Sequence, residues 1–158
     1  MLLYRLGKLK HAHKMDGVGA CDNPGRWNSL GRAMVYTSEA SSTSILEVRV
    51  HVDRARRNYA LATLEIPDNA TILTMEEKDL PSGWKSKRYS RIVRAVGDAF
   101  LSAGTHLALR VPSAIAPGSY NILLNPAHPA IGNVKVITVV PFTFDTRLFR
   151  TARKHGTR

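Results

Sequence analysis

The stretch NYALATLEIP, residues 58–67, has apolar side chains at every second position and ends at a proline. Such alternation is typical of a half-buried strand that ends at the proline. Further short strands are expected at residues 34–36, 71–75, 107–111, 121–124 and 134–140. The apolar periodicity of residues 88–102 instead predicts a helix with Gly104 as its C-cap. Strands and helices do not alternate regularly, so the sequence predicts an α+β fold with a mixed or largely antiparallel sheet.

Two segments on the N-terminal side of this strand are less regular. Residues 17–33 are rich in glycine, asparagine and proline, which predicts an irregular loop. Residues 38–53 alternate like a strand, but Ser44 and Glu47 match a capping box, and Ile45, Val48 and Val52 fit one helical face. We favour a helix over residues 40–52, because small residues lead into this segment.

The length of 158 residues predicts one domain over residues 1–158, in which 146–158 form a basic C-terminal segment whose end frays. No apolar run is long enough for a membrane span, and the first residues lack the order of a signal peptide. Cys21 is the single cysteine, so no internal disulfide can form. We expect a cytoplasmic protein with no membrane association and no metal site.

The formal net charge is +11, with 23 lysines and arginines against 12 acidic residues. One interpretation is nucleic-acid binding, and the other is a basic enzyme with an anionic substrate or partner. The basic clusters are spread along the chain without interleaved aromatic residues. The distribution therefore favours a dinucleotide substrate or an acidic protein partner.

A motif search excludes several common sites. The sequence has neither the dinucleotide-binding glycine fingerprint nor the P-loop, and neither a nucleophile elbow nor a zinc-protease motif.

Three other residues are candidates for a functional site. Arg26 can present its guanidinium to a phosphate, or it can stack on Trp27 or be exposed. Tyr36 can stack on a nicotinamide or adenine ring, or it can belong to the core. Glu47 can bind a ribose hydroxyl and stabilise a cation, or it can face solvent or pair with Arg49.

A third segment, residues 111–129, carries Ser113, Asn125 and His128 close to prolines. Polar side chains at such turns can converge on a ligand, although the same residues are ordinary turn formers.

Four blocks of the chain together resemble the RES family, which is named for an arginine, a glutamate and a serine. They are GRWNSLGRAMVYTSEASSTSILEVRVH (25–51), LPSGWKSKRYSRIVRAVGDAFLSAG (80–104), LRVPSAIAPGSYNILLNPAHP (109–129) and FTFDTRLF (142–149). The resemblance covers nearly the whole chain. It places the family's arginine on Arg26, its tyrosine on Tyr36, its glutamate on Glu47 and its serine on Ser113, with Asn125 as a weaker candidate.

The resemblance implies a fold similar to that of ADP-ribosyltransferases, with a cleft for NAD+ as substrate and no cofactor. It implies a toxin of a type II toxin–antitoxin pair that cleaves the nicotinamide–ribose bond, with water or inorganic phosphate as the acceptor. The alternative is ADP-ribosyl transfer to a protein or nucleic acid. The implied partner is an Xre-like helix-turn-helix antitoxin. The toxin would contact DNA only indirectly, through this antitoxin, and the complex can contain a toxin homodimer.

The resemblance assigns the catalytic site to Glu47, Arg26 and Tyr36, and substrate binding to Arg26, Tyr36, Ser113 and Asn125. Nicotinamide is a cationic leaving group, so we expect Glu47 to stabilise charge on the ribose rather than to act as an acid. One departure from the family is the number of basic residues in the middle block: Lys85, Lys87, Arg88, Arg91 and Arg94.

Overall fold

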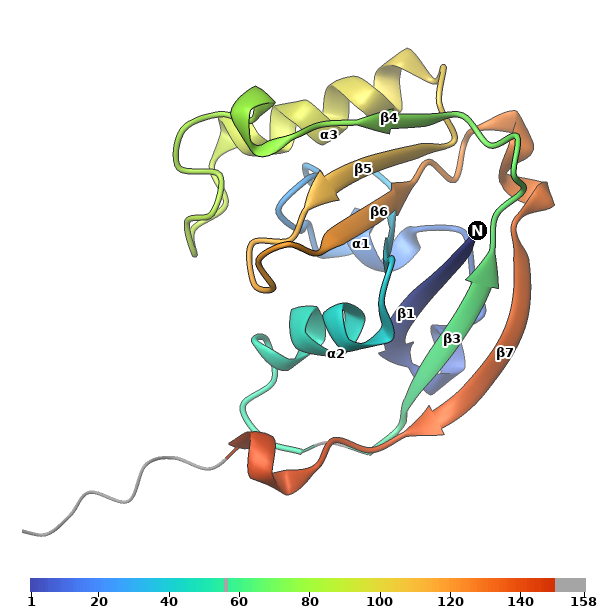
Figure 1. Cartoon of the computed structure of the whole chain (residues 1–158), viewed down its shortest axis with the longest axis vertical. Coiled ribbons are helices and arrows are strands. Elements are labelled where there is room, and N and C mark those ends of the chain that lie inside the picture. Colours follow the sequence, from blue (N-terminus) through green and yellow to red (C-terminus); the bar gives the residue numbers. More distant parts are fainter. Residues whose placement is uncertain (56, 150–158) are drawn as a thin grey trace, which may run out of the picture.

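The computed structural model describes residues 1–55 and 57–149, and in these ranges it forms one seven-stranded sheet (Figure 1). The strand order is β4-β5-β6-β2-β1-β3-β7. The strands are β1 (Leu2–Lys8), β2 (Val35–Ser38), β3 (Tyr59–Glu65), β4 (Ile72–Thr74), β5 (Ala108–Pro112), β6 (Tyr120–Leu124) and β7 (Lys135–Phe142). The helices are α1 (Val18–Asp22), α2 (Ser41–Arg49) and α3 (Arg91–Ala103).

The sheet is mixed, which confirms the predicted α+β class. β4 and β5 run parallel, and every other neighbouring pair runs antiparallel. Four short 3-10 turns lie at Leu9–His11, Glu77–Asp79, Pro129–Asn133 and Thr146–Phe149. The fraying expected at the end of the basic C-terminal segment falls on residues 150–158, outside the described ranges. No helix in the described part of the chain is long and apolar enough to cross a bilayer.

The sequence did not predict the N-terminal strand β1, which lies between β2 and β3 in the interior of the sheet. It pairs with β3 along its whole length, from Leu2 opposite Glu65 to Lys8 opposite Tyr59. Its pairing with β2 is limited to Tyr4 opposite Ser38. The sheet therefore divides into two halves, β4-β5-β6-β2 and β1-β3-β7, that diverge beyond a single bridge.

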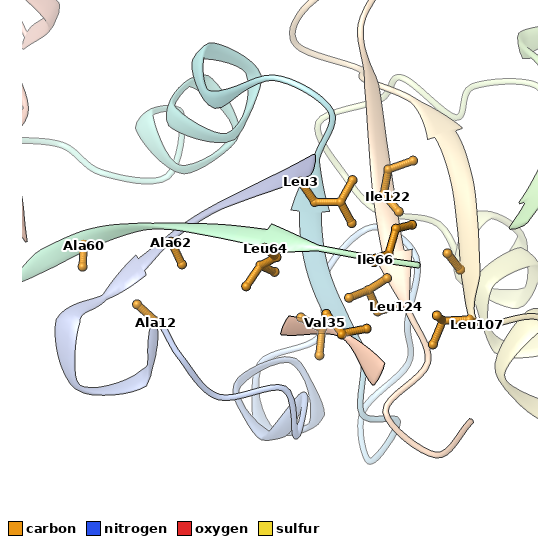
Figure 2. Close-up of a cluster of buried hydrophobic side chains, with 12 residues drawn as sticks. Leu3, Ala12, Val35, Ala60, Ala62, Leu64, Ile66, Leu107, Ile122 and Leu124 are labelled. Carbon is orange, nitrogen blue, oxygen red and sulfur yellow. The ribbon is translucent and has the colours of Figure 1, made fainter. Parts of the chain in front are cut away.

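Both faces of the sheet carry a hydrophobic core. One core packs Leu3, Val35, Leu64, Ile122 and Leu124 beneath the loop that carries Ala12 (Figure 2). The other core lies under α3, where Val93 and Phe100 meet Leu109, Val111 and Leu123 together with Trp27 and Trp84. Successive residues of β5 and β6 alternate between the two cores, as strand geometry requires.

The two predicted helices, over residues 40–52 and 88–102, are both present as α2 and α3, but their ends differ from the prediction. α3 begins after Ser90, whose side chain accepts a hydrogen bond from the Val93 N–H, and it ends at the left-handed Gly104 as expected. The capping-box interpretation of Ser44 is wrong, because α2 already begins at Ser41, after Ala40. The Ser44 hydroxyl instead accepts a hydrogen bond of 2.7 Å from the N–H of Leu6 in β1. This bond ties α2 to the half of the sheet that diverges from β2.

The predicted loop over residues 17–33 contains the short helix α1. The strand expected at residues 107–111 is β5, which runs one residue further, to Pro112, and Pro112 pairs with Tyr120.

Candidate active site

A pocket lies where the two halves of the sheet diverge. α2 contributes Ser44, Glu47 and Val48, and β1 and β6 contribute Leu6 and Asn121. The remaining lining residues are Arg26 and Trp27, Tyr36, Thr37 and Ser38 of β2, and Ala114. Its volume is about 480 Å³ when the part open to solvent is included.

Glu47 is held by two hydrogen bonds to one of its oxygens. Ser113 Oγ and Asn121 Nδ2 each donate to Glu47 Oε1 at 2.7 Å. Asn121 is itself fixed, because Ser38 Oγ donates to its Oδ1 at 2.7 Å. Among the described residues, Glu47 Oε2 accepts no hydrogen bond. The result is a carboxylate of fixed orientation with one oxygen available to a ligand, and the alternative of an ion pair between Glu47 and Arg49 does not form.

The Ser113 hydroxyl is fully used by the protein. It donates to Glu47 and accepts from the N–H groups of Ile115 at 3.1 Å and Ala116 at 2.9 Å. The side chain is buried. The geometry therefore makes Ser113 a residue that positions Glu47.

Arg26 lies at the edge of the pocket and holds a neighbouring segment. Its Nη1 donates to the carbonyl oxygens of Trp84 and, at 2.9 Å, of Ser86. Its guanidinium lies over the Tyr89 ring, 4.8 Å from the centroid, so the ring on which it stacks is that of Tyr89, whereas the alternative considered for Arg26 was stacking on Trp27. No carboxylate in the described ranges lies within 4 Å of Arg26, which leaves its charge available to an anion.

Tyr36 presents its ring to the pocket, whereas its hydroxyl is used inside the protein. The hydroxyl donates to Asn28 Oδ1 at 2.7 Å and accepts from the Trp27 N–H at 3.1 Å. Burial raises the pKa of Tyr36 well above its ordinary value. A Cβ on Gly25 would lie 2.6 Å from the Tyr36 hydroxyl oxygen, so this close approach requires glycine. Tyr36 is therefore a neutral residue whose aromatic ring lines the pocket. Its hydroxyl is not placed to act as a general acid or base.

Asn125 is not brought to the pocket. It follows β6 at the end opposite Asn121, and its Oδ1 accepts from the Ala127 N–H at 3.0 Å. Such a bond from a side-chain oxygen to a backbone N–H is typical of a turn, and Asn125 is not among the residues that line the pocket.

Two residues of the site were missed in the sequence, Asn121 and Ser38. Both lie inside blocks that resemble the RES family, but the resemblance assigned neither a role, and both act through contacts with residues more than 70 positions away. The one available signal was a polar residue at the start of the apolar run Ile122–Leu124.

The divided mixed sheet defines a class of small α+β domains, and comparison with known proteins identifies the family. The RES domain family matches residues 2–145, and the chain belongs to it. The chain is 34% identical to "Toxin Res" of Photorhabdus laumondii subsp. laumondii, over 97% of this chain and 100% of that protein. It is 32% identical to the "Prs ADP-ribosylating toxin" of a Sphingobium species, over 89% of this chain and 90% of that protein.

The fold also matches a solved structure. A chain of the M. tuberculosis MbcT–MbcA toxin–antitoxin complex superposes with a TM-score of 0.71 and 20% identity. The match covers 89% of this chain and 83% of that chain. At this level of identity the likeness establishes the fold alone.

Proposed function

We propose that this protein is the toxin of a toxin–antitoxin pair and that it removes NAD+ by cleaving the nicotinamide–ribose bond. The observation that carries the proposal is the Glu47 carboxylate, fixed by Ser113 and Asn121 with one oxygen free, in a pocket shared with Arg26 and Tyr36. The names of the relatives at 34% and 32% identity support a toxin, and the name of the relative at 32% identity includes ADP-ribosylation.

The chemistry follows from the charge on the leaving group. The bond between ribose C1′ and the nicotinamide nitrogen breaks, and its electron pair neutralises the pyridinium, so no general acid is needed. Positive charge grows on the ribose, and a preorganised carboxylate stabilises it. Water then bonds to C1′ and releases a proton to solvent, which gives ADP-ribose. Alternatively, inorganic phosphate bonds to C1′ as co-substrate and gives ADP-ribose phosphate.

Each residue has a role that agrees with its contacts. Glu47 binds the ribose and stabilises the cation, and Ser113 and Asn121 keep its oxygens in place. Tyr36 stacks its ring against the nicotinamide end. Arg26 contacts the diphosphate. The reaction needs no cofactor beyond the substrate and no metal.

A second candidate function is ADP-ribosyl transfer to a protein or nucleic acid, which the name of the Sphingobium relative favours. NAD+ labelled in the adenosine half separates the two functions. Free ADP-ribose or ADP-ribose phosphate supports small-molecule cleavage, whereas a labelled macromolecule supports transfer.

The proposed partner is an Xre-like helix-turn-helix antitoxin, supported by the toxin–antitoxin complex that shares this fold. DNA would be reached only through that antitoxin, and the complex can include a homodimer of the toxin. Light scattering of the purified pair would give its stoichiometry.

The test of Glu47 is the substitution Glu47→Gln, which preserves the shape of the side chain and an oxygen that can accept from Ser113 and Asn121. We expect NAD+ loss to slow by a factor on the order of 100 or more, because the charge that stabilises the cation is removed. Glu65→Gln is the matched control, since Glu65 is an exposed glutamate at the end of β3. The control should keep full activity. Undiminished NAD+ loss by Glu47→Gln would refute the assignment.

A further inference from the structure

A hollow lies outside the active-site pocket, at the end of the sheet where β1 ends and β3 begins (Figure 1). We call it the strand-end hollow, and its volume is about 920 Å³ when the part open to solvent is included. The residues that line it are Lys8, Leu9, Lys10, Arg57, Asn58 and Tyr59. None of them lines the active-site pocket, so this space is separate from the proposed reaction.

The strand-end hollow is cationic. Lys8, Lys10 and Arg57 are exposed, and no carboxylate in the described ranges lies within 4 Å of their charged groups. No acidic residue is among those that line the hollow. A hydrogen bond of 2.8 Å from the Leu9 N–H to the Asn58 carbonyl oxygen joins the two segments that carry these charges. The fold therefore gathers cations from two distant parts of the chain around one concave space.

The fold also adds an aromatic ring to these cations, although the basic clusters have no interleaved aromatic residues in the sequence. Lys8 and Tyr59 are directly opposite in the pairing of β1 with β3, so their side chains lie side by side on one face of the sheet. The Tyr59 ring meets Phe144 edge to face, with 5.6 Å between the ring centroids, and this contact fixes its orientation. Cations beside a fixed aromatic ring are the combination that binds single-stranded nucleic acid, because phosphates pair with the cations and unpaired bases stack on the ring.

The cationic surface continues past Lys8 into an adjoining hollow. Lys8 lines both spaces, and the adjoining one also contains Arg5 and Lys14 together with Asp16 and Asp22. The Arg5 guanidinium donates from Nη1 to the Lys14 carbonyl oxygen, but no carboxylate among the described residues lies within 4 Å of it. Burial lowers the pKa of Arg5, and the charge of Asp16 opposes this effect only in part. A partly desolvated cation without an ion-pair partner is costly, and a bound phosphate would offset that cost.

We propose that the strand-end hollow binds single-stranded nucleic acid, with phosphates on Lys8, Lys10 and Arg57 and one unpaired base stacked on Tyr59. The adjoining hollow favours a polymer over a free nucleotide, because the backbone can continue past Lys8 toward Arg5. Duplex DNA does not fit this role, since its paired bases are stacked on one another and cannot reach the Tyr59 ring. An acidic peptide would meet the cations but would leave the ring unused. The inference does not depend on the proposed NAD+ reaction.

The first test measures the cations, by fluorescence anisotropy of a labelled oligouridine of about 12 nucleotides with the full chain. Three phosphate contacts predict that the logarithm of the binding constant falls with the logarithm of the KCl concentration with a slope of about −2. We expect Lys10→Gln to reduce this slope by about 0.7 and to raise Kd roughly fivefold to tenfold at about 50 mM KCl. Lys78→Gln is the matched control, because Lys78 is an exposed lysine that follows β4 at one edge of the sheet and lines neither hollow. Its Kd should stay within about twofold of the wild type.

The second test measures the ring. We expect Tyr59→Leu to raise Kd about tenfold, the loss typical of one base stacked on an aromatic side chain. Tyr59→Phe keeps the ring and should stay within about twofold of the wild type. The exposed substitution Lys10→Gln keeps the inference testable if Tyr59→Leu does not fold.

Four results would overturn the inference. They are no binding of oligouridine by the wild type, equal Kd values for Lys10→Gln and Lys78→Gln, duplex DNA of the same length binding as tightly as the single strand, and equally effective competition by polyglutamate, which would assign the hollow to an acidic protein. Oligothymidine of the same length separates the two sources of single strands, because tighter binding of one polymer identifies the ligand as RNA or as DNA. NAD+ loss by Lys10→Gln should equal that of the wild type, so a failure of the proposed reaction and a failure of this inference give different results.

Discussion

The hydroxyl of Tyr36 has a structural task that is separable from the task of its ring. It joins Asn28 to the backbone of Trp27, and so fixes the loop that carries Arg26. Replacing Tyr36 by phenylalanine keeps the ring and leaves the Trp27 N–H without its acceptor. We expect the free energy of unfolding at pH 7 to fall by about 1–3 kcal/mol, the cost of an unsatisfied buried group.

The effect of Tyr36→Phe should depend on pH in one direction. Because burial raises the pKa of Tyr36 above its ordinary value of 10.0, the unfolded chain releases this proton at lower pH than the folded chain. The stabilising contribution is therefore complete below about pH 10 and declines as the pH rises above that value. Urea unfolding from pH 7 to pH 11 should show the two proteins converging. Tyr59→Phe is the control, since in the described ranges the Tyr59 hydroxyl has no hydrogen-bond partner. A constant difference across this range would contradict the account.

The sequence identified four candidate site residues, because their order and the surrounding blocks resemble a family. These residues are Arg26, Tyr36, Glu47 and Ser113. Their physical roles could not be predicted from the sequence, since each role depends on residues that are distant along the chain. Glu47 looked like a charge in an apolar run, yet its apolar neighbours Leu46 and Val50 are 37% and 49% exposed. The buried residues of α2 are the polar Thr43 and Ser44. The helix turns polar side chains inward because it faces a pocket, and hydrophobic periodicity cannot detect that arrangement.

At the scale of elements, the packing of α3 against the Arg26 loop depends on Gly97. A Cβ at this position would lie 1.8 Å from the Trp27 carbonyl oxygen, a backbone atom that cannot rotate away. Ala normally stabilises a helix by about 1 kcal/mol relative to Gly. We expect Gly97→Ala to have the opposite sign and to destabilise by about 1–3 kcal/mol or more, because helix and loop must separate. Gly19→Ala in α1 is the control, since a Cβ at Gly19 would meet no other atom within 4 Å. Thermal unfolding of both variants decides, and a more stable Gly97→Ala protein would disprove the contact.

The elements with regular patterns were predictable, and the central strand was not. β3 and α3 follow the periodicities of a half-buried strand and an amphipathic helix. In β1, Leu2 and Leu3 are adjacent, and only Leu3 and Leu6 are buried. This spacing of three fits neither strand alternation nor a long helix, so local pattern carried no signal. Its position between β2 and β3 arises from long-range pairing that sequence periodicity does not encode.

At the scale of the whole molecule, the division of the sheet creates the site. β1 and β2 share a single bridge, and α2 fills the gap by bonding to Leu6 on one side while placing Glu47 near Asn121 on the other. The pocket therefore lies on a seam between two rigid half-sheets, each with its own strand pairing. Such a seam holds side chains from both halves at fixed distances, as a preorganised site requires.

The high positive charge has a consequence for the stability of the folded chain. The formal net charge is +11, and the described residues form five ion pairs, none of which includes Lys8, Lys10 or Lys14. Desolvation, followed by the charges of these lysines, lowers the pKa of the neighbouring His11. Cations thus crowd together here with Asp16 as an opposing charge near His11, and folding brings the cations closer than they are in the unfolded chain.

Salt should therefore stabilise this protein rather than weaken it. Raising NaCl from 10 mM to 150 mM shortens the screening length from about 30 Å to about 8 Å. We expect Tm to rise by roughly 2–4 °C, which corresponds to about 1 kcal/mol for a chain of this size. The matched variant replaces Lys8, Lys10 and Lys14 by glutamate, which removes two units of charge at each position and lowers the formal net charge from +11 to +5. Its Tm at low salt should exceed that of the wild type, and its response to NaCl should be smaller. A wild-type Tm that falls with NaCl would mean that the few attractive pairs outweigh the repulsion, contrary to this expectation.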